Sequence, residues 1–341
     1  MADTTDQAGW RYGAIPAAVT VALSNQDLAA FERVALGLSL KYGEYPLGHP
    51  ALLAEVELAT RSLPERLLAR LIEFRTAGND AGTLLIRNLP VDEPLPPTPA
   101  SDAAAPDWSA LPISTLTQLA VMTVLGEVIA YADEKDGRLV QDVCPVAGAE
   151  QRQENTGSRL LELHTEDGFH PYKPELISLF CLRPDHDGVA ATVTGSARAA
   201  LRAMPADRHR TLRAPVYRIR FSSSFTGDGP ARYSEVMPVL SGPADDPDLC
   251  VDFHAMEAVR ADGADALERL RTAMQHALIG AVLQPGDLIV VDNRVAVHGR
   301  TDFNPRYDGA DRWLRRCFAV ADLRPSRGVR PDNSRVLAPI D

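Results

Sequence analysis

The stretch LELHTEDGFHP, residues 161–171, places His164 and Glu166 two positions apart, and His170 follows four residues later. On an extended strand, alternate side chains point the same way, so such an imidazole and carboxylate can approach one ion together. A histidine–x–glutamate pair is a weak signal by itself, because ordinary loops contain the same pair. If the two residues bind a metal, a further ligand must come from elsewhere in the chain.

His298 is the best placed of the other histidines. It lies in DLIVVDNRVAVHGR, residues 287–300, just after an apolar run, and Gly299 would let the backbone approach a site closely. Two histidines and one carboxylate on one face are the ligand set of many iron sites, with three positions left open. His170 rivals His164 but has no carboxylate two residues further on. The alternative is that these are structural histidines near strand ends.

The segment after His298 contains two arginines that need partners. In TDFNPRYDGADRWLRRCFAVADL, residues 301–323, Arg312 and Arg316 bracket an aromatic residue and lead into an apolar strand. A buried guanidinium is unfavourable unless it meets a carboxylate, ideally in bidentate fashion. A dicarboxylic cosubstrate that chelates the metal at one end would place its other carboxylate here. The alternative is a surface strand whose arginines pair with Asp308 or Asp311.

Composition narrows the class of protein. The chain has 341 residues, 45% of them hydrophobic and 24% charged, and a formal net charge of −11, which argues against a nucleic-acid partner. The four cysteines lie far apart, as expected in a reducing compartment. No apolar run approaches the ~20 residues needed to span a bilayer, and the opening residues do not resemble a secretory signal. We therefore expect a cytoplasmic protein without a membrane partner.

The apolar pattern changes along the chain. Helical spacing extends over 25–77, with Ser24 or Asn25 and Ser62 as N-caps and Gly78 as the end of the last helix. A short strand at 82–90, a proline-rich surface loop and an apolar helix at 113–131 follow. The rest predicts short strands and one helix, at about 262–281. The strands fall within 137–146, 174–183, 214–225, 236–242, 248–253, 286–293 and 315–323.

This pattern predicts an α+β protein with a mainly β core. We expect one domain, 1–341, in which a helical N-terminal layer (about 20–135) packs on a sandwich or barrel (about 136–325). The polar, glycine-containing segment 220–235, RFSSSFTGDGPARYSE, is flanked by strands and is predicted to be a mobile lid. The alternative for this segment is an ordinary hairpin loop.

The two motifs together resemble a known family. LELHTEDGFHPYKPELISLFCLR and VDNRVAVHGRTDFNPRYDGADRWLRRCFAVADL are similar to the clavaminate-synthase-like branch of the Fe(II)/2-oxoglutarate oxygenases, in particular hydroxylases of free arginine and lysine. The likeness is strong over about 158–192 and 283–323 and weaker elsewhere. It implies a double-stranded β-helix, or cupin-like jelly roll. It also implies Fe(II), 2-oxoglutarate and O2 as the reactants that the enzyme uses to hydroxylate its substrate.

The resemblance assigns roles position by position. It implies that His164, Glu166 and His298 bind iron, and that Arg312, assisted by Thr192, binds the distal carboxylate of 2-oxoglutarate. Arg316 matches a second arginine that holds the substrate's carboxylate or supports the cosubstrate. Related halogenases have a small residue where this protein has its carboxylate ligand, so we expect hydroxylation rather than halogenation.

The predicted substrate is a free L-amino acid, hydroxylated at C3 or C4. Glu134 and Asp252 are candidate partners for a cationic side chain, and both would otherwise be solvated loop carboxylates. The arginine hydroxylases carry two aspartates at alternate positions, which here fall on Cys250 and Asp252. Because a guanidinium favours two acceptors and an ammonium needs fewer, this departure favours lysine over arginine.

Two smaller points complete these expectations. Gly157 and Ser158, just before the first motif, could contact the substrate's α-groups through a backbone amide or a hydroxyl. Two other functions stay open from the sequence: a jelly-roll protein that binds a metal or a small acid without redox turnover, and an oxygenase of a peptide or a carrier-tethered substrate.

Overall fold

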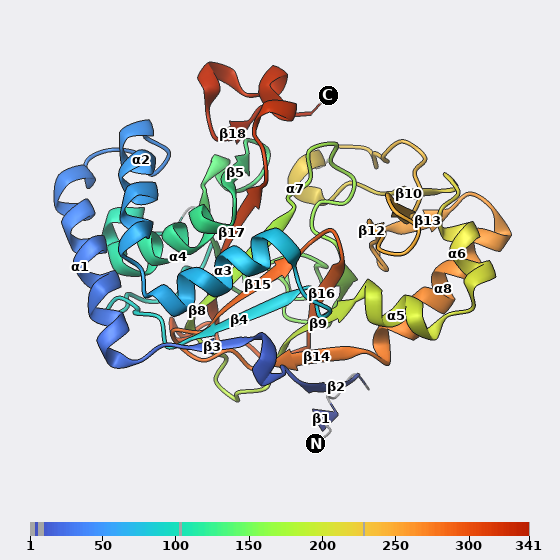
Figure 1. Ribbon diagram of the computed structural model, residues 1–341, viewed down its shortest axis with the longest axis horizontal. Helices are drawn as coiled ribbons and strands as arrows, with labels where there is room; N and C mark the ends of the chain where they lie inside the picture. Colours follow the sequence, from blue (N-terminus) through green and yellow to red (C-terminus); the bar gives the residue numbers. More distant parts are fainter. Residues whose placement is uncertain (1–3, 6–9, 102–103, 228, 341) are drawn as a thin grey trace.

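Two β-sheets form the centre of the protein in a computed structural model that describes residues 4–5, 10–101, 104–227 and 229–340 (Figure 1). Apart from β6, which pairs only with β17, neighbouring strands in each sheet are named in hydrogen-bonding order. The larger sheet contains β18 (Val336–Leu337), β5 (Glu127–Tyr131), β17 (Trp313–Val320), β8 (Leu176–Arg183), β15 (Leu288–Asp292), β4 (Thr83–Arg87) and β3 (Thr20–Ala22), with β6 (Val140–Val143). The smaller contains β1 (Thr4–Thr5), β2 (Arg11–Ala14), β14 (Leu278–Ala281), β9 (Thr192–Ser196), β16 (Ala296–Arg300) and β7 (Leu161–His164).

The polypeptide alternates between these two sheets. Strands β7, β8 and β9 fall in the smaller, larger and smaller sheet, and β14 to β17 repeat the alternation. Such an alternation winds two strands around a common axis, which is the double-stranded β-helix expected from the resemblance. The fold class predicted from the sequence is therefore confirmed.

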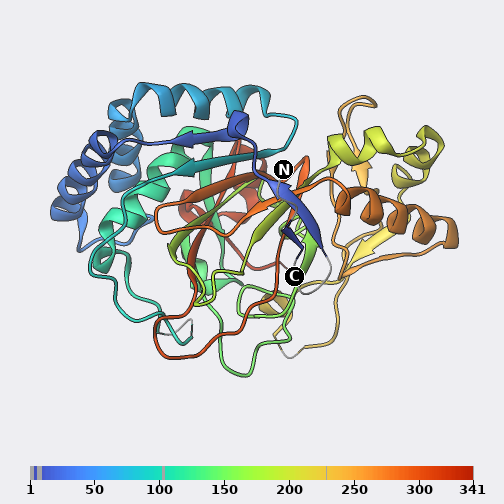
Figure 2. The same ribbon diagram turned by 90° about the horizontal axis from the view of Figure 1, so that it is seen from below.

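Helices cover the outer face of the larger sheet (Figures 1 and 2). The apolar helix α4 lies between the other N-terminal helices and strands β17 and β8, and its Leu119, Val121 and Met122 are fully or almost fully buried. Burying such side chains contributes about 1.5–3 kcal/mol each. The N-terminal helices are α1 (Asn25–Tyr42), α2 (Pro50–Ala59), α3 (Glu65–Ala77) and α4 (Pro112–Leu125).

A second group of helices and two small sheets lies on the opposite side of the molecule (Figure 1). Helices α5 and α8 pack on β9, and α6 packs on α8. The helices of this group are α5 (Ala197–Ala203), α6 (Ala206–Leu212), α7 (Ser223–Thr226) and α8 (Ala261–Gln275). The two small sheets pair β10 (Tyr217–Ile219) with β13 (Met256–Ala258) and β11 (Leu240–Ser241) with β12 (Asp248–Leu249).

Strand alternation decides which side chains reach the space between the sheets. In β17, Leu314 packs with Leu179 in the interior cluster, whereas Trp313 and Cys317 belong to the core under the helices. Because successive strand residues face opposite sides, Arg316 points into the interior with Leu314. Arg315 lies on the other face and pairs with Asp142 at 3.1 Å.

The helix caps follow the sequence in part. Ser24 caps α1 in a reciprocal capping box with Asp27, and Gly78 ends α3 with a φ of 60°. Ser62 is not an N-cap: it ends a short 3-10 helix, Thr60–Ser62, and Pro64 occupies the N-cap position of α3.

Two predicted helices were too long. The helix expected over 113–131 ends at Leu125, and residues 127–131 form β5; the helix expected over 262–281 ends at Gln275, and residues 278–281 form β14. In both places an apolar run continues from a helix into a buried strand, so hydrophobicity alone does not reveal the boundary. Helices α5, α6 and α7 were not predicted. Within the described part of the protein, no helix combines the length and apolar character needed to cross a membrane.

Candidate active site

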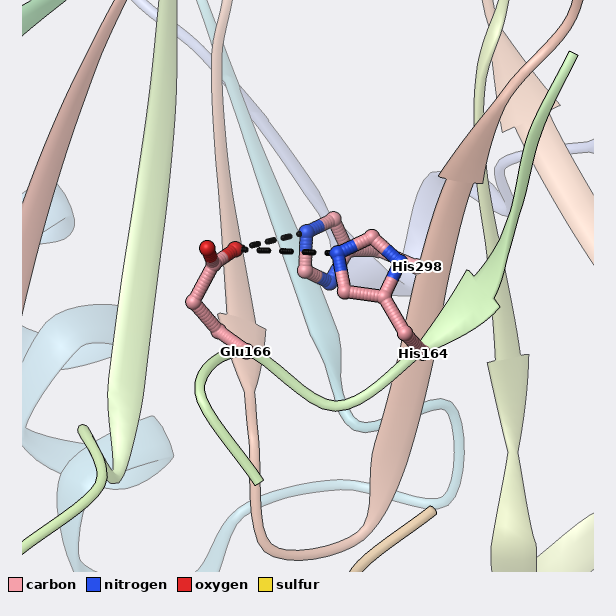
Figure 3. A group of neighbouring side chains, drawn as sticks. All are labelled: His164, Glu166 and His298. Atoms are coloured by element: carbon pink, nitrogen blue, oxygen red, sulfur yellow. Dashed lines mark ion pairs between the residues drawn. The ribbon is translucent and has the colours of Figure 1, made fainter. Parts of the chain in front are cut away.

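Three side chains from the two sequence motifs converge inside the sandwich (Figure 3). Strands β7 and β16 are antiparallel neighbours, and His164 lies directly opposite His298. Glu166 follows β7, and its Oε2 lies 3.1 Å from His298 Nε2 and 3.9 Å from His164 Nε2. The three side chains each offer a donor atom within 4.8 Å of the others, so together they could hold one metal ion.

Hydrogen bonds to the backbone position His164 and the loop that carries Glu166. His164 Nδ1 lies 2.8 Å from the carbonyl of Glu162, so this nitrogen carries the proton and Nε2 presents its lone pair to the site. Asn293 holds the loop that follows β7: its Oδ1 accepts from the Glu166 amide, and its Nδ2 donates to the Glu166 carbonyl. Asn293 is fully buried and was not predicted as a site residue.

The charges of the three side chains suit a divalent cation. Burial alone would raise the pKa of Glu166, but Arg316 and His298 outweigh burial and hold that pKa well below its ordinary value. Burial and the neighbouring His164 ring lower the pKa of His298. Neutral imidazoles beside an ionised carboxylate are the ligands of non-haem Fe(II) sites, so the residues present fit that ion.

A buried guanidinium lies on the same side of the interior. Arg312 is 5% exposed, and its Nη2 lies 3.5 Å from Thr192 Oγ1. Within the described residues Arg312 forms no ion pair, and burial lowers the pKa of its guanidinium. Asp308 and Asp311 contact His186 instead, at 3.2 and 3.6 Å. The alternative pairing of Arg312 with those aspartates therefore does not occur, and Arg312 could accept a ligand's carboxylate.

Arg316 occupies a different position, next to the metal-ligand group. Its Nη1 donates to Glu166 Oε1 at 2.6 Å, and its Nη2 donates to Glu134 Oε1 and Gln141 Oε1. Asp167 lies close enough for its charge to act on both carboxylates. Burial raises the pKa of Glu134 although Arg316 opposes it, and burial and the two glutamates raise that of Asp167.

These carboxylates leave acceptors unused. Glu134 Oε2 and Asp167 Oδ2 are buried and have no hydrogen-bond partner among the described residues. Glu166 and Glu134 share the Arg316 guanidinium, and Asp167 lies near enough for its charge to be felt. Buried acceptors without donors are rare in native proteins. These unused oxygens could accept hydrogen bonds from a cation with several N–H donors.

Asp252 is a further carboxylate that lines the same cavity as the metal-ligand candidates. Asp252 forms an isolated bridge with His164, so its backbone lies beside β7. Its Oδ1 accepts from the amides of His254 and Ala255, which fixes the carboxylate. The Cys250 thiol instead donates to the Gly168 carbonyl.

One cavity of about 260 Å³ is lined by the metal-ligand candidates, the two arginines and the carboxylates described above. Its walls include the three metal-ligand candidates with Glu134, Thr192, Asp252, Arg312 and Arg316, and also Asn155, Asp167 and Arg300, which were not predicted. Gly157 and Ser158 are not part of the lining, in contrast to the prediction. The preceding residues 152–156 line it instead, because Ser158 is engaged through its backbone with Glu150 and Phe303.

The predicted lid contributes to the cavity wall. Ser222, Ser223 and Ser224 line the cavity, and the last two belong to α7. Glu154 Oε1 accepts hydrogen bonds from the amide and the hydroxyl of Ser223, at 2.9 and 2.6 Å. Two loops therefore meet across the cavity through this contact.

A jelly roll with two histidines and a carboxylate at its centre defines a non-haem iron oxygenase, and comparison with known proteins gives the family. The model of the taurine catabolism dioxygenase TauD, TfdA family matches residues 109–318. L-asparagine oxygenase of Streptomyces coelicolor is 39% identical, over 93% of this chain and 94% of that protein. L-lysine 3-hydroxylase of Catenulispora acidiphila is 37% identical, over 84% of this chain and 80% of that protein.

Solved structures agree. Asparagine oxygenase in complex with Fe(II), 2S,3S-3-hydroxyasparagine and succinate superimposes with a TM-score of 0.88 and 37% identity, over 94% of this chain and 99% of the other. The protein belongs to the TauD, TfdA family. It is a dioxygenase of the type that depends on Fe(II), 2-oxoglutarate and O2.

Proposed function

We propose that this enzyme hydroxylates an unactivated C–H bond of a free L-amino acid, with L-asparagine as the favoured substrate. His164, Glu166 and His298 would hold Fe(II), and Arg312 with Thr192 would hold the distal carboxylate of 2-oxoglutarate. When bound, iron and 2-oxoglutarate activate O2, with one oxygen atom passing to the substrate and the other to the succinate that forms with CO2. The protein's own residues decide which C–H bond lies within reach.

The observation that carries a free amino acid is the group of charges around Arg316. A free amino acid has one carboxylate and one ammonium on the same carbon. Within the described residues Arg316 Nη1 makes one hydrogen bond, to Glu166, so its second N–H is available for the carboxylate. The unused oxygens Glu134 Oε2 and Asp167 Oδ2 supply acceptors for the ammonium. A peptide-bound residue has neither charge, so a peptide would leave these buried groups unpaired.

Asp252 and Asn155 support a substrate with a carboxamide group. Both line the cavity, and together they offer a carboxylate acceptor for an amide N–H and an amide donor for its carbonyl. Asp252 bridges to the metal-ligand candidate His164 through the backbone, so a substrate held between Arg316 and Asp252 would lie beside the metal site. The high identity to an L-asparagine oxygenase points the same way. In asparagine, C3 is the only carbon beyond the α-carbon that bears hydrogen.

L-lysine, the substrate favoured from the sequence alone, is the second candidate. Asp252 without a second carboxylate at position 250 suits a compact ammonium, and an L-lysine 3-hydroxylase is among the relatives. Lysine is longer than asparagine and would have to extend past Asp252 toward the lid segment 220–235. We further propose that residues 1–341 form one oxygenase domain and that this segment closes over the bound substrate.

Incubation with Fe(II), 2-oxoglutarate and each amino acid separately, followed by mass spectrometry, tests this function. We expect a mass gain of one oxygen for asparagine, with one succinate formed per product. Asp252→Ala should abolish the preference for asparagine over the other amino acids. Cys250→Ala is the control and should retain this preference, because the Cys250 thiol donates to the Gly168 carbonyl. Product from lysine alone would move the assignment to the second candidate. Absence of product with every free amino acid would move the assignment to an oxygenase of a peptide or a carrier-tethered substrate.

A further inference from the structure

A second buried arginine, Arg300, faces the interior next to Thr192. Arg300 is 4% exposed and lies two residues after His298 in β16, so strand alternation turns both side chains to the same face. Its direct cross-strand neighbour in β9 is Thr192, which Arg312 contacts. Arg300 and Arg312 therefore enter one region from two strands, and both line the cavity.

Among the described residues, no carboxylate contacts either guanidinium. The hydrogen bonds that Arg300 donates within the described residues go to backbone carbonyls, from Nη2 to Arg159 at 2.6 Å and from Nε to Thr301 at 3.3 Å. Its guanidinium lies 5.0 Å from the centre of the Phe303 ring, and that of Arg312 lies 5.9 Å from the same ring. In the part of the protein that the structure describes, neither arginine forms an ion pair.

Two like charges buried side by side are unfavourable unless an anion joins them. Other buried arginines of this protein illustrate the rule, since Arg315 pairs with Asp142 and Arg316 with two glutamates. Asp302 and Asp185 act on Arg300 and Arg312 through their charges but form no ion pair with them, so an anion that joins the two guanidinium groups would come from a ligand. Its place beside Thr192 is the place proposed for the distal carboxylate of 2-oxoglutarate.

We infer that Arg300 is a second guanidinium of the cosubstrate pocket, which acts with Arg312 to select a keto acid that carries a distal carboxylate. This inference rests on the proposed function, because it requires 2-oxoglutarate to bind beside Arg312. The hydrogen bond to Arg159 holds the Arg300 side chain in this position and anchors the loop that lines the cavity before β7. Arg300 is thus a specificity-determining residue for the diacid rather than for the amino acid.

Calorimetric titration of Mn(II)-loaded protein tests the inference without turnover. We expect Arg300→Gln to weaken 2-oxoglutarate binding about tenfold or more, because a hydrogen bond to a charged group is lost. Arg300→Lys should retain part of the affinity, since it keeps the charge. Arg183→Gln is the matched control: its guanidinium also donates only to neutral oxygens and lies near an aromatic ring, but Arg183 is absent from the cavity lining.

Pyruvate, which lacks the distal carboxylate, separates recognition of charge from a structural role. If Arg300 acts on that carboxylate, Arg300→Gln leaves pyruvate binding unchanged while 2-oxoglutarate binding falls. An equal loss for both acids, or wild-type affinity for 2-oxoglutarate in Arg300→Gln, overturns the inference. If Arg312→Gln loses affinity and Arg300→Gln does not, only this inference fails. If the wild type does not bind 2-oxoglutarate, the proposed function fails as well.

Discussion

Replacing Arg316 by leucine should destabilise the metal-free protein strongly, because this guanidinium balances two buried carboxylates. Arg316 lies 2.6 Å from Glu166 and also pairs with Glu134, and the three side chains are only 5%, 9% and 6% exposed. Removing one partner of a buried ion pair typically costs about 3–5 kcal/mol, since the remaining charge stays desolvated. A domain's whole stability is about 5–15 kcal/mol, so the variant should approach the limit of folding.

Urea unfolding in the presence of a chelator measures this loss. Adding Glu134→Gln to Arg316→Leu removes one of the two unbalanced carboxylates and should restore a measurable part of the stability. Co(II) should also restore part of it, because the metal would neutralise Glu166. The control is Arg324→Leu, which removes an exposed pair with Asp322 at 2.7 Å and should change stability little. If Arg316→Leu loses no more than this control, the electrostatic account of the site is wrong.

Three further predictions concern the metal, the strand pairing and pH. Glu166→Gln should weaken Co(II) binding by more than about a hundredfold in calorimetry, because it removes the only charged ligand candidate, whereas loss of an outer partner typically costs 10–100-fold. Gly299→Ala should lower both stability and metal affinity, because a Cβ at this position would lie 2.7 Å from the Leu161 carbonyl and force β16 away from β7. A variant with the same urea midpoint as the wild type would contradict this account of the packing. Burial lowers the pKa of His170 to about 4 in the folded protein, whereas the unfolded chain has the ordinary value of about 6.5. As the pH falls below about 6.5, a proton therefore binds to this imidazole only in the unfolded chain, so acid destabilises the fold. When the pH is lowered from about 7.5 to about 5, the free energy of unfolding of His170→Asn, measured with urea, should fall by about 2 kcal/mol less than that of the wild type.

The metal-ligand candidates could be predicted from the sequence. His164 and Glu166 are two residues apart and His298 follows a buried apolar run, which made them candidates, and the resemblance over 158–192 and 283–323 implied that they act as one ligand set. Arg300 carried a usable signal as well, because it is two residues from His298 on the same strand. Arg300 was not predicted, because an arginine two residues from a histidine does not by itself indicate a site that binds a ligand's carboxylate. That Arg300 lies near Thr192 and Arg312 depends on the pairing of strands β9 and β16.

Other features depend on tertiary contacts that local pattern does not encode. The apolar run over 113–131 is continuous in hydrophobicity, yet Gly126 separates α4 from β5 because a Cβ at that position would lie 2.6 Å from the Val320 carbonyl. Glu134 was predicted as a partner for a substrate's cationic side chain; its Oε1 accepts from Arg316, far along the sequence, and its Oε2 is the atom left for a substrate. Only the pairing of β5 and β6 with β17 brings them together.

The direct opposition of His164 and His298 has a consequence for how this enzyme matures. The two histidines come from strands that pair only once the polypeptide has been made past residue 300, and a slip of one residue would turn one imidazole out of the interior. A shorter ribosome-bound polypeptide would offer incoming iron no complete set of ligands. Loading of the metal should therefore follow closure of the β-helix, and captured iron would then lock the alignment of the two strands.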